Sequence, residues 1–432
     1  MRRLDVYLGE GLAGALTELP GSPVALEFCY DRAWLQWPQR VALSLSMPLR
    51  AEPYPHEVAA PYFANILPEG DPRDVIGQRL GIAPNDIYAM LEALGRDCAG
   101  ALVILPHGSA PPPPLPKPGS PPYLAMPRGQ VGRLIDGLPQ RPLGIDPDDG
   151  GARLSLAGVQ DKLVLSRVGA GWVLPDEGLP STHIIKPANP RLPGSVENEA
   201  LCLDLAARTG LDTARATIDS IDGRRCLVVT RYDRSFVDGG PRRIHQEDFC
   251  QALSRWPNQK YENRGGPGLV DCFRILESVS APAVDRLKLL DAVAFNVLVG
   301  NVDAHAKNFS ILHLPGGTVR LAPLYDLMCG DPYENLTQNS AMAVGGSRRG
   351  DHIYQSNWDM LAHDAGLGAA NLRRRIRSTM ERAIGVLPQA EETTRAMVPE
   401  SSFVGLISAF IRRRGATMIA NLAHKDAAAA RA

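Results

Sequence analysis

The sequence predicts an α+β protein, with a β-rich N-terminal domain and then a second part that begins with strands and ends with helices. Three observations support this fold class. Strand patterns prevail before residue 244, helical patterns prevail after it, and a proline-rich stretch separates two strand-bearing parts. At 432 residues the chain is too long for one ordinary core, so we expect two or three domains.

The composition is that of a globular protein without a membrane segment. Hydrophobic residues make up 44% and charged residues 22%, and no uncharged apolar run is long enough to cross a bilayer. A net charge of −1 argues against binding nucleic acid through bulk electrostatics. The seven cysteines are dispersed without a CxxC pair, and Met1-Arg2-Arg3 does not open a signal peptide. We therefore expect a cytoplasmic protein with reduced thiols.

Residues 1–108 form the first predicted domain. Its predicted strands are 4–8, 24–30, 41–47 and 98–105, and its helical segments are 61–70, 71–80 and 86–94. Gly9, Gly11 and Gly14 spell the GxGxxG pattern of dinucleotide-binding loops. Such a loop must open a crossover helix, and the prolines and glycine of 20–23 leave no room for one. A β-hairpin is therefore favoured, with dinucleotide binding as the minority alternative.

A proline-rich stretch follows at 106–122 and includes the run APPPPLPKPGSPP. Such a segment lacks backbone donors and favours polyproline II, which suits a spacer between domains. A ligand for proline-binding domains is the less frequent alternative. We assign residues 109–149 to this linker and a connecting segment.

Residues 150–240 are predicted to be strand-rich with one helix. The predicted strands are 172–174, 182–186 and two hairpins, one around a tight turn in 154–167 and one joining 216–221 to 226–230 about Asp222-Gly223. The helix covers 195–209 and has Glu197 and Glu199 in its first turn, where acidic residues suit the helix dipole. Residues 241–432 are mostly helical, at 246–253, 269–277, 283–300, 372–386 and 402–422.

One short stretch, Gly300 to Ser310 (GNVDAHAKNFS), concentrates polar residues between an apolar helix and a strand. Asp303 and Asn308 are five residues apart, the spacing of the protein-kinase catalytic loop H-R-D-x-x-x-x-N, and Asp326 follows. Phosphoryl transfer needs one carboxylate to accept the proton of the attacking hydroxyl. It also needs an amide oxygen and a second carboxylate to hold Mg²⁺ against the phosphates. Capping and turn residues are the alternative, which explains one such residue better than the whole set.

Further residues stand in the order of a two-lobed protein-kinase fold, with a strand-rich N-lobe and a helical C-lobe. Lys186 ends a predicted strand and Glu199 follows on a helix, as the phosphate-binding lysine and its glutamate do in kinases. Either residue alone is more often a surface charge. Thr230 and Tyr232 follow an apolar strand and are candidates for the hinge that meets adenine, although an ordinary strand end explains them equally well.

The segment before this lysine lacks both the Walker A pattern and the glycine-rich pattern of kinases. Ala157 and Gly158 nevertheless allow a close approach of the backbone, so amide groups there are candidates for cradling phosphates. On spacing alone this signal is weak.

Several motifs together resemble the HipA-type serine/threonine kinases, the toxins of bacterial toxin–antitoxin pairs. They are SLAGVQDK, THIIKP, RYDR, HQEDFCQAL, KYENRGGPG and GNVDAHAKNFS, with LSLSMPL and PYFANILPEG near the start. The resemblance covers nearly the whole chain and includes motifs without catalytic residues. The proline spacer and the Ala-rich end match no motif of the family.

The resemblance implies an ATP- and Mg²⁺-dependent protein kinase with Asp303 as the base and Asn308 and Asp326 as Mg²⁺ ligands. It implies that Ser155 is autophosphorylated. The nucleotide-binding residues that it implies are Lys186, Thr230, Tyr232, His305, Tyr325 and the loop Ala157, Gly158, Val159, Gln160, Asp161 and Lys162. The implied partner is a small HipB-like helix-turn-helix antitoxin, through which DNA contact would mainly come. The implied substrates are aminoacyl-tRNA synthetases, notably glutamyl-tRNA synthetase.

Two other functions fit parts of the pattern. A small-molecule kinase of the aminoglycoside type shares the Asp-to-Asn spacing, but the N-terminal domain and Ser155 weigh against it. A non-catalytic co-repressor would use the same fold only to dock on a DNA-bound antitoxin. The intact residues Asp303, Asn308, Asp326 and Lys186 weigh against that function. A kinase toxin is therefore the favoured interpretation.

Overall fold

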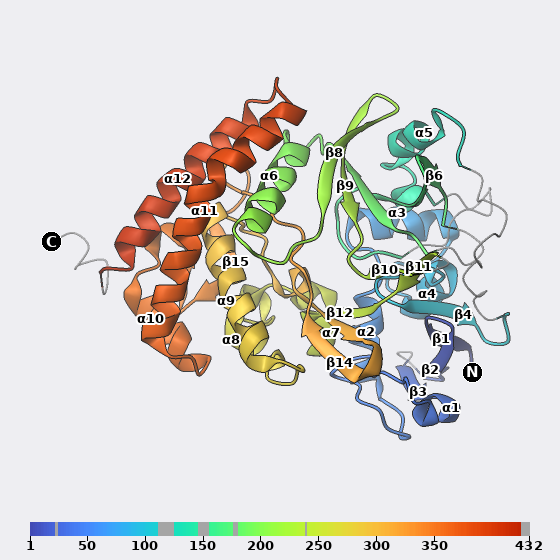
Figure 1. The fold of residues 1–432 in the computed structure, drawn as a ribbon. Coiled ribbons are helices and arrows are strands. Elements are labelled where there is room, and N and C mark those ends of the chain that lie inside the picture. The colour runs from blue at the N-terminus through green and yellow to red at the C-terminus, as the bar shows by residue number, and fades with distance from the viewer. Residues whose placement is uncertain (22–24, 111–124, 146–154, 176–179, 238–239, 425–432) are drawn as a thin grey trace. The chain divides into compact units, whose positions relative to one another are not determined.

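The computed structural model describes residues 1–21, 25–110, 125–145, 155–175, 180–237 and 240–424. The chain divides into two compact units (Figure 1). The first unit comprises Met1–Pro187, Asp219–Pro257 and Ile311–Val319, and the second comprises Ala188–Ile218, Asn258–Ser310 and Arg320–Ala432. The first is rich in strands and the second in helices, as the predicted α+β class requires. The domain boundaries predicted at residues 108, 149 and 240 stay predictions.

The first unit opens with a four-stranded antiparallel sheet in the order β3-β2-β1-β4. Its strands are β1 (Arg3–Leu8), β2 (Gly11–Leu19), β3 (Ala25–Tyr30) and β4 (Leu102–Pro106). The turn between β1 and β2 contains Gly9, whose φ of 63° lies in the left-handed region. At Gly14 a Cβ atom would lie 2.3 Å from the carbonyl oxygen of Cys29 on β3. The GxGxxG pattern therefore belongs to a hairpin, because its glycines serve a turn and a close strand contact.

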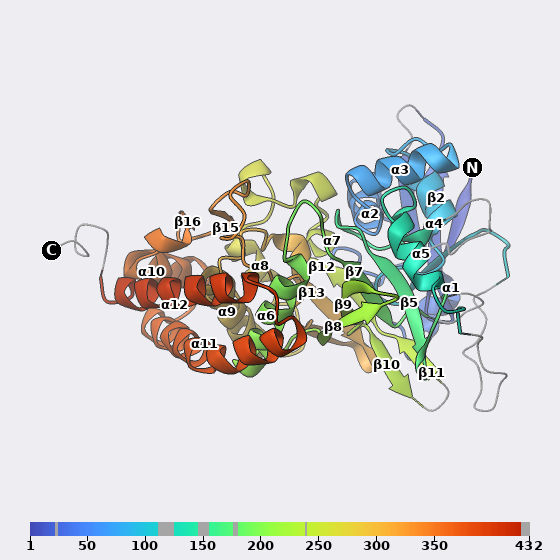
Figure 2. The same ribbon diagram turned by 90° about the horizontal axis from the view of Figure 1, so that it is seen from above.

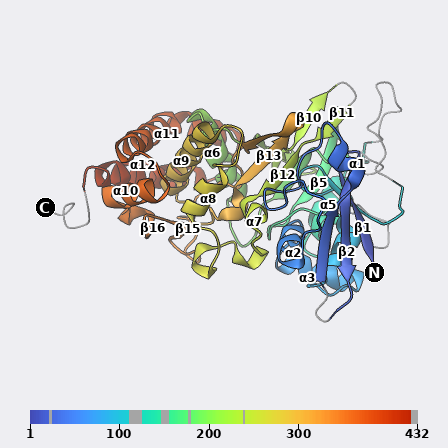
Figure 3. The same ribbon diagram turned by 90° about the horizontal axis from the view of Figure 1, so that it is seen from below.

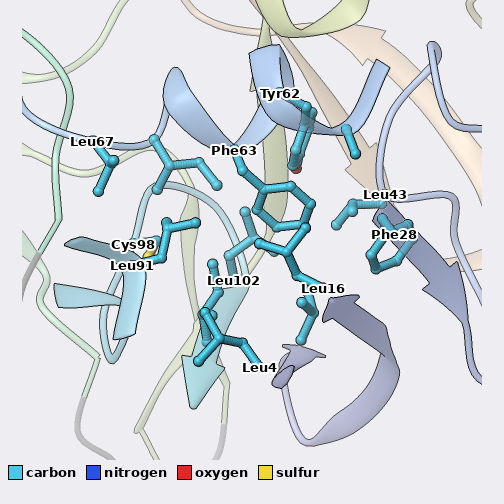
Figure 4. Close-up of a cluster of buried hydrophobic side chains, with 14 of the residues drawn as sticks. Leu4, Leu16, Phe28, Leu43, Tyr62, Phe63, Leu67, Leu91, Cys98 and Leu102 are labelled. Carbon is cyan, nitrogen blue, oxygen red and sulfur yellow. The ribbon is translucent and has the colours of Figure 1, made fainter. Parts of the chain in front are cut away.

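Four helices accompany this sheet: α1 (Arg32–Gln36), α2 (His56–Ala64), α3 (Asp71–Leu80) and α4 (Ile87–Leu94). Figure 4 shows part of the shared core, where Leu4, Leu16 and Phe28 from the strands lie near Phe63 of α2. All four side chains are fully buried, and the ring centroids of Phe28 and Phe63 are 5.8 Å apart. Removing this apolar surface from water is the main force that holds sheet and helices together.

Two predicted elements of this region are wrong. Residues 41–47 form no strand apart from an isolated bridge between Ser44 and Met47, because Ser44 donates its hydroxyl hydrogen bond to the buried carboxylate of Glu247. The helix predicted at 61–70 begins earlier, at His56, and ends at Ala64. Proline is common in the first helical turn, but Pro61 lies inside α2, so this signal misplaces the start.

A second sheet of the first unit has the order β6-β5-β7-β9-β8. Its strands are β5 (Leu163–Val168), β6 (Gly171–Val173), β7 (His183–Pro187), β8 (Ala216–Ile221) and β9 (Arg224–Thr230). Asp222 and Gly223, with φ of 49° and 82°, make the predicted tight turn between β8 and β9. The strand expected before β5 is absent from 155–162, which forms a loop. Residues 111–124 of the proline-rich stretch lie outside the described residues, and 125–145 contain α5 (Gln130–Gly137) and the 3₁₀ turn η1 (Pro142–Gly144).

Smaller elements complete the strand-rich part. They are the hairpin β10 (Arg234–Val237) and β11 (Gly240–Arg243), the three-stranded sheet β12 (His245–Asp248), β13 (Ser310–Leu314) and β14 (Thr318–Leu321), and the short helix α7 (Phe249–Ala252). The helix predicted at 246–253 starts later, at Phe249. Asp248 caps this helix with its side chain in a capping box with Gln251, so the residues before it are free to form a strand.

The second unit is mostly helical (Figures 2 and 3). Its helices are α6 (Ser195–Arg208), α8 (Leu269–Ile275), α9 (Pro282–Val299), α10 (Gln355–Asp364), α11 (Ala369–Met397) and α12 (Phe403–Asn421), and it includes the hairpin β15 (Asn339–Val344) and β16 (Ser347–Arg349). Helix α11 packs against α6, α9 and α12. None of the helices in the described ranges combines the length and the apolarity that crossing a bilayer requires.

Candidate active site

The loop that contains Asp303 follows the largely buried helix α9. The helix is capped by Gly300, whose φ of 68° is the left-handed conformation of many helix ends. A Cβ atom at this position would also lie 2.7 Å from the ring of Phe410 on α12. Both the backbone and the packing therefore require glycine where the helix ends and the loop of residues 301–308 begins.

Asn301 connects this loop to two other segments. It is 4% exposed, and its Nδ2 donates to Oδ1 of Asn296 at 2.8 Å and to the carbonyl oxygen of Asp326 at 3.4 Å. Its Oδ1 accepts the backbone N–H of Asp303 at 3.2 Å. Both predicted acidic residues are thus tied to one amide that the sequence analysis did not single out. The feature of the sequence that could have identified Asn301 is its position directly after the glycine that ends a buried helix.

The carboxylate of Asp303 is accessible and oriented. Its side chain is 61% exposed, and the hydroxyl of Tyr261 donates to Oδ1 at 2.6 Å. Nε2 of His305, a residue that is only 4% exposed, lies 3.8 Å from the same oxygen. The rings of His305 and Tyr261 meet edge to face with centroids 5.0 Å apart. A carboxylate that is reachable from solvent and held by neighbours has the geometry of a general base.

Asn308 and Asp326 present oxygen atoms of the kind that a metal ion binds. Nδ2 of Asn308 donates to the carbonyl oxygen of Asp303 at 2.8 Å, so its amide oxygen is the atom that points elsewhere. Asp326 has a φ of 55°, and such a left-handed conformation costs a residue with a side chain about 1–3 kcal/mol. Backbone strain of this kind clusters at functional sites.

Tyr325 braces the neighbouring segment. Its hydroxyl donates to the carbonyl oxygen of Lys307 at 2.8 Å and lies 2.6 Å from Oγ of Ser310. The backbone of Leu324 is bonded on both sides to residues 212–214, with N–H to oxygen distances of 2.8 Å. The second unit therefore brings together five of the predicted residues: Asp303, His305, Asn308, Tyr325 and Asp326.

Helix α6 carries the predicted supporting residue Glu199, which is 2% exposed. The helix begins at Ser195, so Glu197 lies in its first turn and Glu199 does not; this detail of the prediction is wrong. Between them, Asn198 accepts the N–H of Cys329 at 2.8 Å and donates to its carbonyl oxygen at 2.8 Å. Asn198 thus ties α6 to the chain that follows Asp326, a role that the sequence did not reveal.

The first unit holds the other predicted residues. Lys186 lies on β7 and is 8% exposed, and Thr230 ends the adjacent strand β9, where it pairs with His183. Tyr232 follows directly, and its hydroxyl donates to the amide oxygen of Gln246. Lys186 and Thr230 therefore lie on neighbouring strands, and Tyr232 lies in the turn that follows β9.

The loop of residues 155–162 is folded onto the segment after α2. Ser155 is fully buried, its Oγ donates to the carbonyl oxygen of Ile66 at 2.8 Å, and its N–H donates to the carbonyl oxygen of Asp97 at 3.0 Å. Gly158 has a φ of 109°, which favours glycine, and Nζ of Lys162 donates to the carbonyl oxygen of Ala157. The lysine therefore closes the loop on itself.

Charged side chains form a buried cluster around Asp97, next to the start of this loop. Asp97, Arg231, Asp233 and Arg234 are each at most 5% exposed, and Arg243 reaches Asp97 at 2.9 Å. Burial alone would raise the pKa of Asp97, but the arginines outweigh it and lower this pKa below its usual range. Burial also acts to raise the pKa of Asp233, but Arg231 and Arg234 together outweigh it and lower this pKa to about 2. Both carboxylates therefore stay ionised at neutral pH.

The donor set suits Mg²⁺ better than a metal that needs a full protein cage. No three His, Cys, Asp or Glu side chains cluster as a metal site within the described ranges. Mg²⁺ in kinases needs fewer protein ligands, because phosphates and waters complete its shell of oxygens. Asn308 and Asp326 supply the hard oxygen donors that Mg²⁺ prefers, on two segments that Asn301 links. The residues present therefore fit the ion.

Two family models match the chain. The model described as HipA-like C-terminal domain covers residues 154–387, and the model described as HipA N-terminal domain covers residues 4–105. The chain belongs to the HipA family.

Relatives within this family match over nearly the whole chain. The serine/threonine-protein kinase toxin HipA of Shewanella oneidensis is 31% identical over 93% of this chain and 92% of its own length. The protein named "Putative kinase Y4mE" of Sinorhizobium fredii is 42% identical over 93% of this chain and 95% of its own length. A chain in the solved Shewanella oneidensis complex of HipA, HipB and operator DNA has a TM-score of 0.79 at 27% identity, with 97% of this chain and 96% of that chain covered.

The protein is thus a HipA-type serine/threonine-protein kinase, and the predicted family, fold class and enzyme class are confirmed. The roles of individual residues stay predictions.

Replacing Asn301 tests whether its amide supports the HipA loop. Asn301→Ala leaves the buried Oδ1 of Asn296 without its donor, so we expect unfolding free energy to fall by about 1–3 kcal/mol. The exposed Asn339→Ala in the same unit is the matched control and should stay within about 0.5 kcal/mol of wild type. Denaturant titration of both variants measures the difference. Equal stability would contradict the supporting role of the amide.

Proposed function

We propose that this HipA-family kinase transfers the γ-phosphoryl group of ATP to a serine or threonine hydroxyl of a protein, with Asp303 as the general base. The observation that carries the proposal is the accessible Asp303 carboxylate, held by Tyr261 and followed by Asn308 at the kinase spacing. The acceptor O–H gives its proton to Asp303, and the acceptor oxygen bonds to the γ-phosphorus. The bond to the β–γ bridging oxygen then breaks and ADP leaves.

The chain's own oxygens support the metal part of this proposal. Asn308 and Asp326 would hold Mg²⁺, which would supply charge neutralisation at the phosphates. The bond from Nδ2 of Asn308 to the Asp303 backbone keeps the amide oxygen directed away from the loop. The left-handed backbone of Asp326 is a strained conformation of the kind that clusters at functional sites.

The remaining predicted residues would serve the nucleotide. Lys186 would bind the phosphates with its ammonium group, and Glu199 would be its supporting carboxylate. Thr230 and Tyr232 would line the adenine site, and His305 and Tyr325 would border the nucleotide. The loop residues Ala157, Gly158, Val159, Gln160, Asp161 and Lys162 would contribute backbone amides to the phosphates. The positive φ of Gly158 supports this last role, since it allows a turn that a side chain would disfavour.

The two rival functions are weaker on specific grounds. A small-molecule kinase would not explain the presence of the N-terminal HipA domain of residues 4–105. A dead kinase that only docks on an antitoxin has no need to keep Asp303 accessible and hydrogen-bonded while Asp326 stays in a strained conformation.

Asp303→Asn tests the base. The amide is nearly isosteric, so the fold and nucleotide binding should persist, but the side chain no longer accepts a proton. We expect transfer of labelled phosphate from [γ-³²P]ATP to proteins of a bacterial lysate to fall by a factor of about 10² or more. Asp364→Asn, an exposed residue at the end of α10, is the matched control and should transfer at the wild-type rate. Full activity of Asp303→Asn would remove Asp303 from the role of base.

Partner and substrate follow from the same proposal. The solved Shewanella oneidensis neighbour contains HipA, HipB and operator DNA, and this chain matches that neighbour over nearly its full length. We propose a HipB-like helix-turn-helix antitoxin as the partner and an aminoacyl-tRNA synthetase, with glutamyl-tRNA synthetase first, as the substrate. A net charge of −1 supports indirect rather than direct contact with DNA.

A DNA-binding experiment distinguishes a toxin that contacts DNA through an antitoxin from a protein that binds DNA directly. The protein alone should bind an operator duplex weakly, whereas adding a helix-turn-helix partner of the HipB type should place both on the duplex. An electrophoretic mobility shift assay at fixed salt measures this, with the partner alone as the control. Tight, sequence-specific binding by the isolated kinase would contradict the proposal.

Ser155 is proposed as an off switch. Its hydroxyl is fully buried and donates a hydrogen bond to the carbonyl oxygen of Ile66, an atom that cannot donate one in return. A phosphoserine adds about −1.5 to −2 charge at neutral pH and needs donors or water around it. The charged group does not fit the buried position, so the loop of residues 155–162 would leave its place and lose its contacts to phosphates.

Phosphorylation of Ser155 should therefore lower ATP affinity, by about tenfold or more, while the fold of the second unit persists. Mass spectrometry after incubation with Mg²⁺ and ATP would locate the modification, and nucleotide titration would compare the phosphorylated and unphosphorylated protein. Phosphatase treatment is the control and should restore the affinity. Equal affinity of the two forms, or no phosphate at Ser155 after prolonged incubation, would refute the switch.

A further inference from the structure

The residue nearest to the Asp303 carboxylate comes from a segment with no predicted role. Tyr261 lies 42 residues earlier in the chain, and its hydroxyl donates to Oδ1 of Asp303 at 2.6 Å. The contact at 3.8 Å from His305 also reaches Oδ1. Both side-chain contacts of Asp303 within the described residues therefore use Oδ1, and neither uses Oδ2.

The segment that delivers Tyr261 is a tight turn. The carbonyl oxygen of Tyr261 accepts the N–H of Arg264 at 2.9 Å and that of Gly266 at 3.0 Å. A Cβ atom at Gly266 would lie 1.9 Å from the carbonyl oxygen of Gln259, so the turn closes only around glycine. Oε2 of Glu262 accepts the N–H of Ala343 on β15 at 2.6 Å. The turn is thus anchored on the hairpin, and the backbone of Tyr261 has a fixed position.

The ring of Tyr261 is held as well as its backbone. The Nζ atom of Lys260 lies 5.6 Å from the ring centroid and the guanidinium carbon of Arg264 lies 5.5 Å from it. His305 meets the ring edge to face at 5.0 Å. Cations over an aromatic face attract its electron density, so these contacts restrict the ring. The phenol therefore approaches Asp303 as a preorganised donor.

We propose that Tyr261 is a positioning residue for phosphoryl transfer, whose hydroxyl fixes the Asp303 carboxylate so that Oδ2 meets the acceptor hydroxyl. This inference rests on the proposed role of Asp303 as base. An exposed carboxylate otherwise rotates about its Cβ–Cγ bond, and only a fraction of its orientations accept the proton in line with attack on phosphorus. Tyr261 keeps its own proton throughout, so the acceptor proton still goes to Asp303 and the bonds formed and broken in the transfer are the same.

A positioning role and a structural role differ in what Tyr261→Phe changes. The variant keeps the ring and its contacts to His305, Lys260 and Arg264, and removes only the hydroxyl. We expect the rate of ³²P transfer to lysate proteins at saturating ATP to fall about tenfold, the effect of one hydrogen bond to a charged group. The KM for ATP and the thermal unfolding temperature should stay at the wild-type values, because the hydroxyl donates to the exposed Asp303 carboxylate and the variant keeps the packing of the ring.

Tyr354→Phe is the matched control. Tyr354 lies in the same unit, is half-buried like Tyr261, and precedes α10 outside the proposed site. Its rate should equal that of wild type. A Tyr261→Phe rate within about twofold of this control would overturn the proposal, and so would a rate increase, which would make the contact an obstruction. A rise in the KM for ATP, or a lower unfolding temperature that accounts for the loss, would also overturn it in favour of a structural role.

Asp303→Asn in the same assay separates the two proposals. If Asp303→Asn is inactive while Tyr261→Phe matches the control, the assignment of Asp303 as base is supported and the positioning role of Tyr261 is refuted. If Asp303→Asn remains fully active, the assignment of the base fails, and the inference about Tyr261 fails with it.

Discussion

A single buried amide, that of Asn301, determines where the polar residues of the second unit lie. It bonds to the helix that ends at Gly300, to the backbone of Asp303 and to the backbone of Asp326. A buried side-chain amide has two donors and two acceptor positions, and leaving them unpaired would be costly. The two acidic segments are therefore held together by the requirement to satisfy one polar group, and Tyr325 adds a second brace through Lys307 and Ser310.

In the first unit, a cluster of buried charged side chains holds chain segments together, as Asn301 does in the second unit. Asp97 and Asp233 are buried among Arg231, Arg234 and Arg243, and the backbone of Asp97 receives the N–H of Ser155. Buried ion pairs add little net stability compared with apolar packing, but removing one partner leaves an uncompensated charge that costs about 3–5 kcal/mol. The cluster therefore specifies a position more than it strengthens the fold. That position is where the loop of residues 155–162 begins.

The residues around Asp303 in the second unit are more tightly restrained than the loop of residues 155–162 in the first unit. Around Asp303, glycines at 266 and 300, the strained Asp326 and the clamped ring of Tyr261 all reduce the freedom of the groups proposed to react. The loop that starts at Ser155 is instead held by hydrogen bonds, among them that of the Ser155 hydroxyl to Ile66, which a phosphate at Ser155 would remove. The groups proposed to react are therefore held rigidly, whereas the loop proposed to bind phosphates can be displaced.

The sequence by itself determined much of this kinase, because some of its signals are local. The turn at Asp222-Gly223 and the hairpin at Gly9 depend on neighbouring residues, and the structure has both where expected. The strand wrongly expected at 41–47 shows the limit, since the partner of Ser44 is Glu247, which no local pattern indicates. Tyr261, Asn198 and the Asp97 cluster were missed for the same reason. Their contacts join residues 42 to 146 positions apart, and such pairs are decided only when burial forces distant polar groups to satisfy one another.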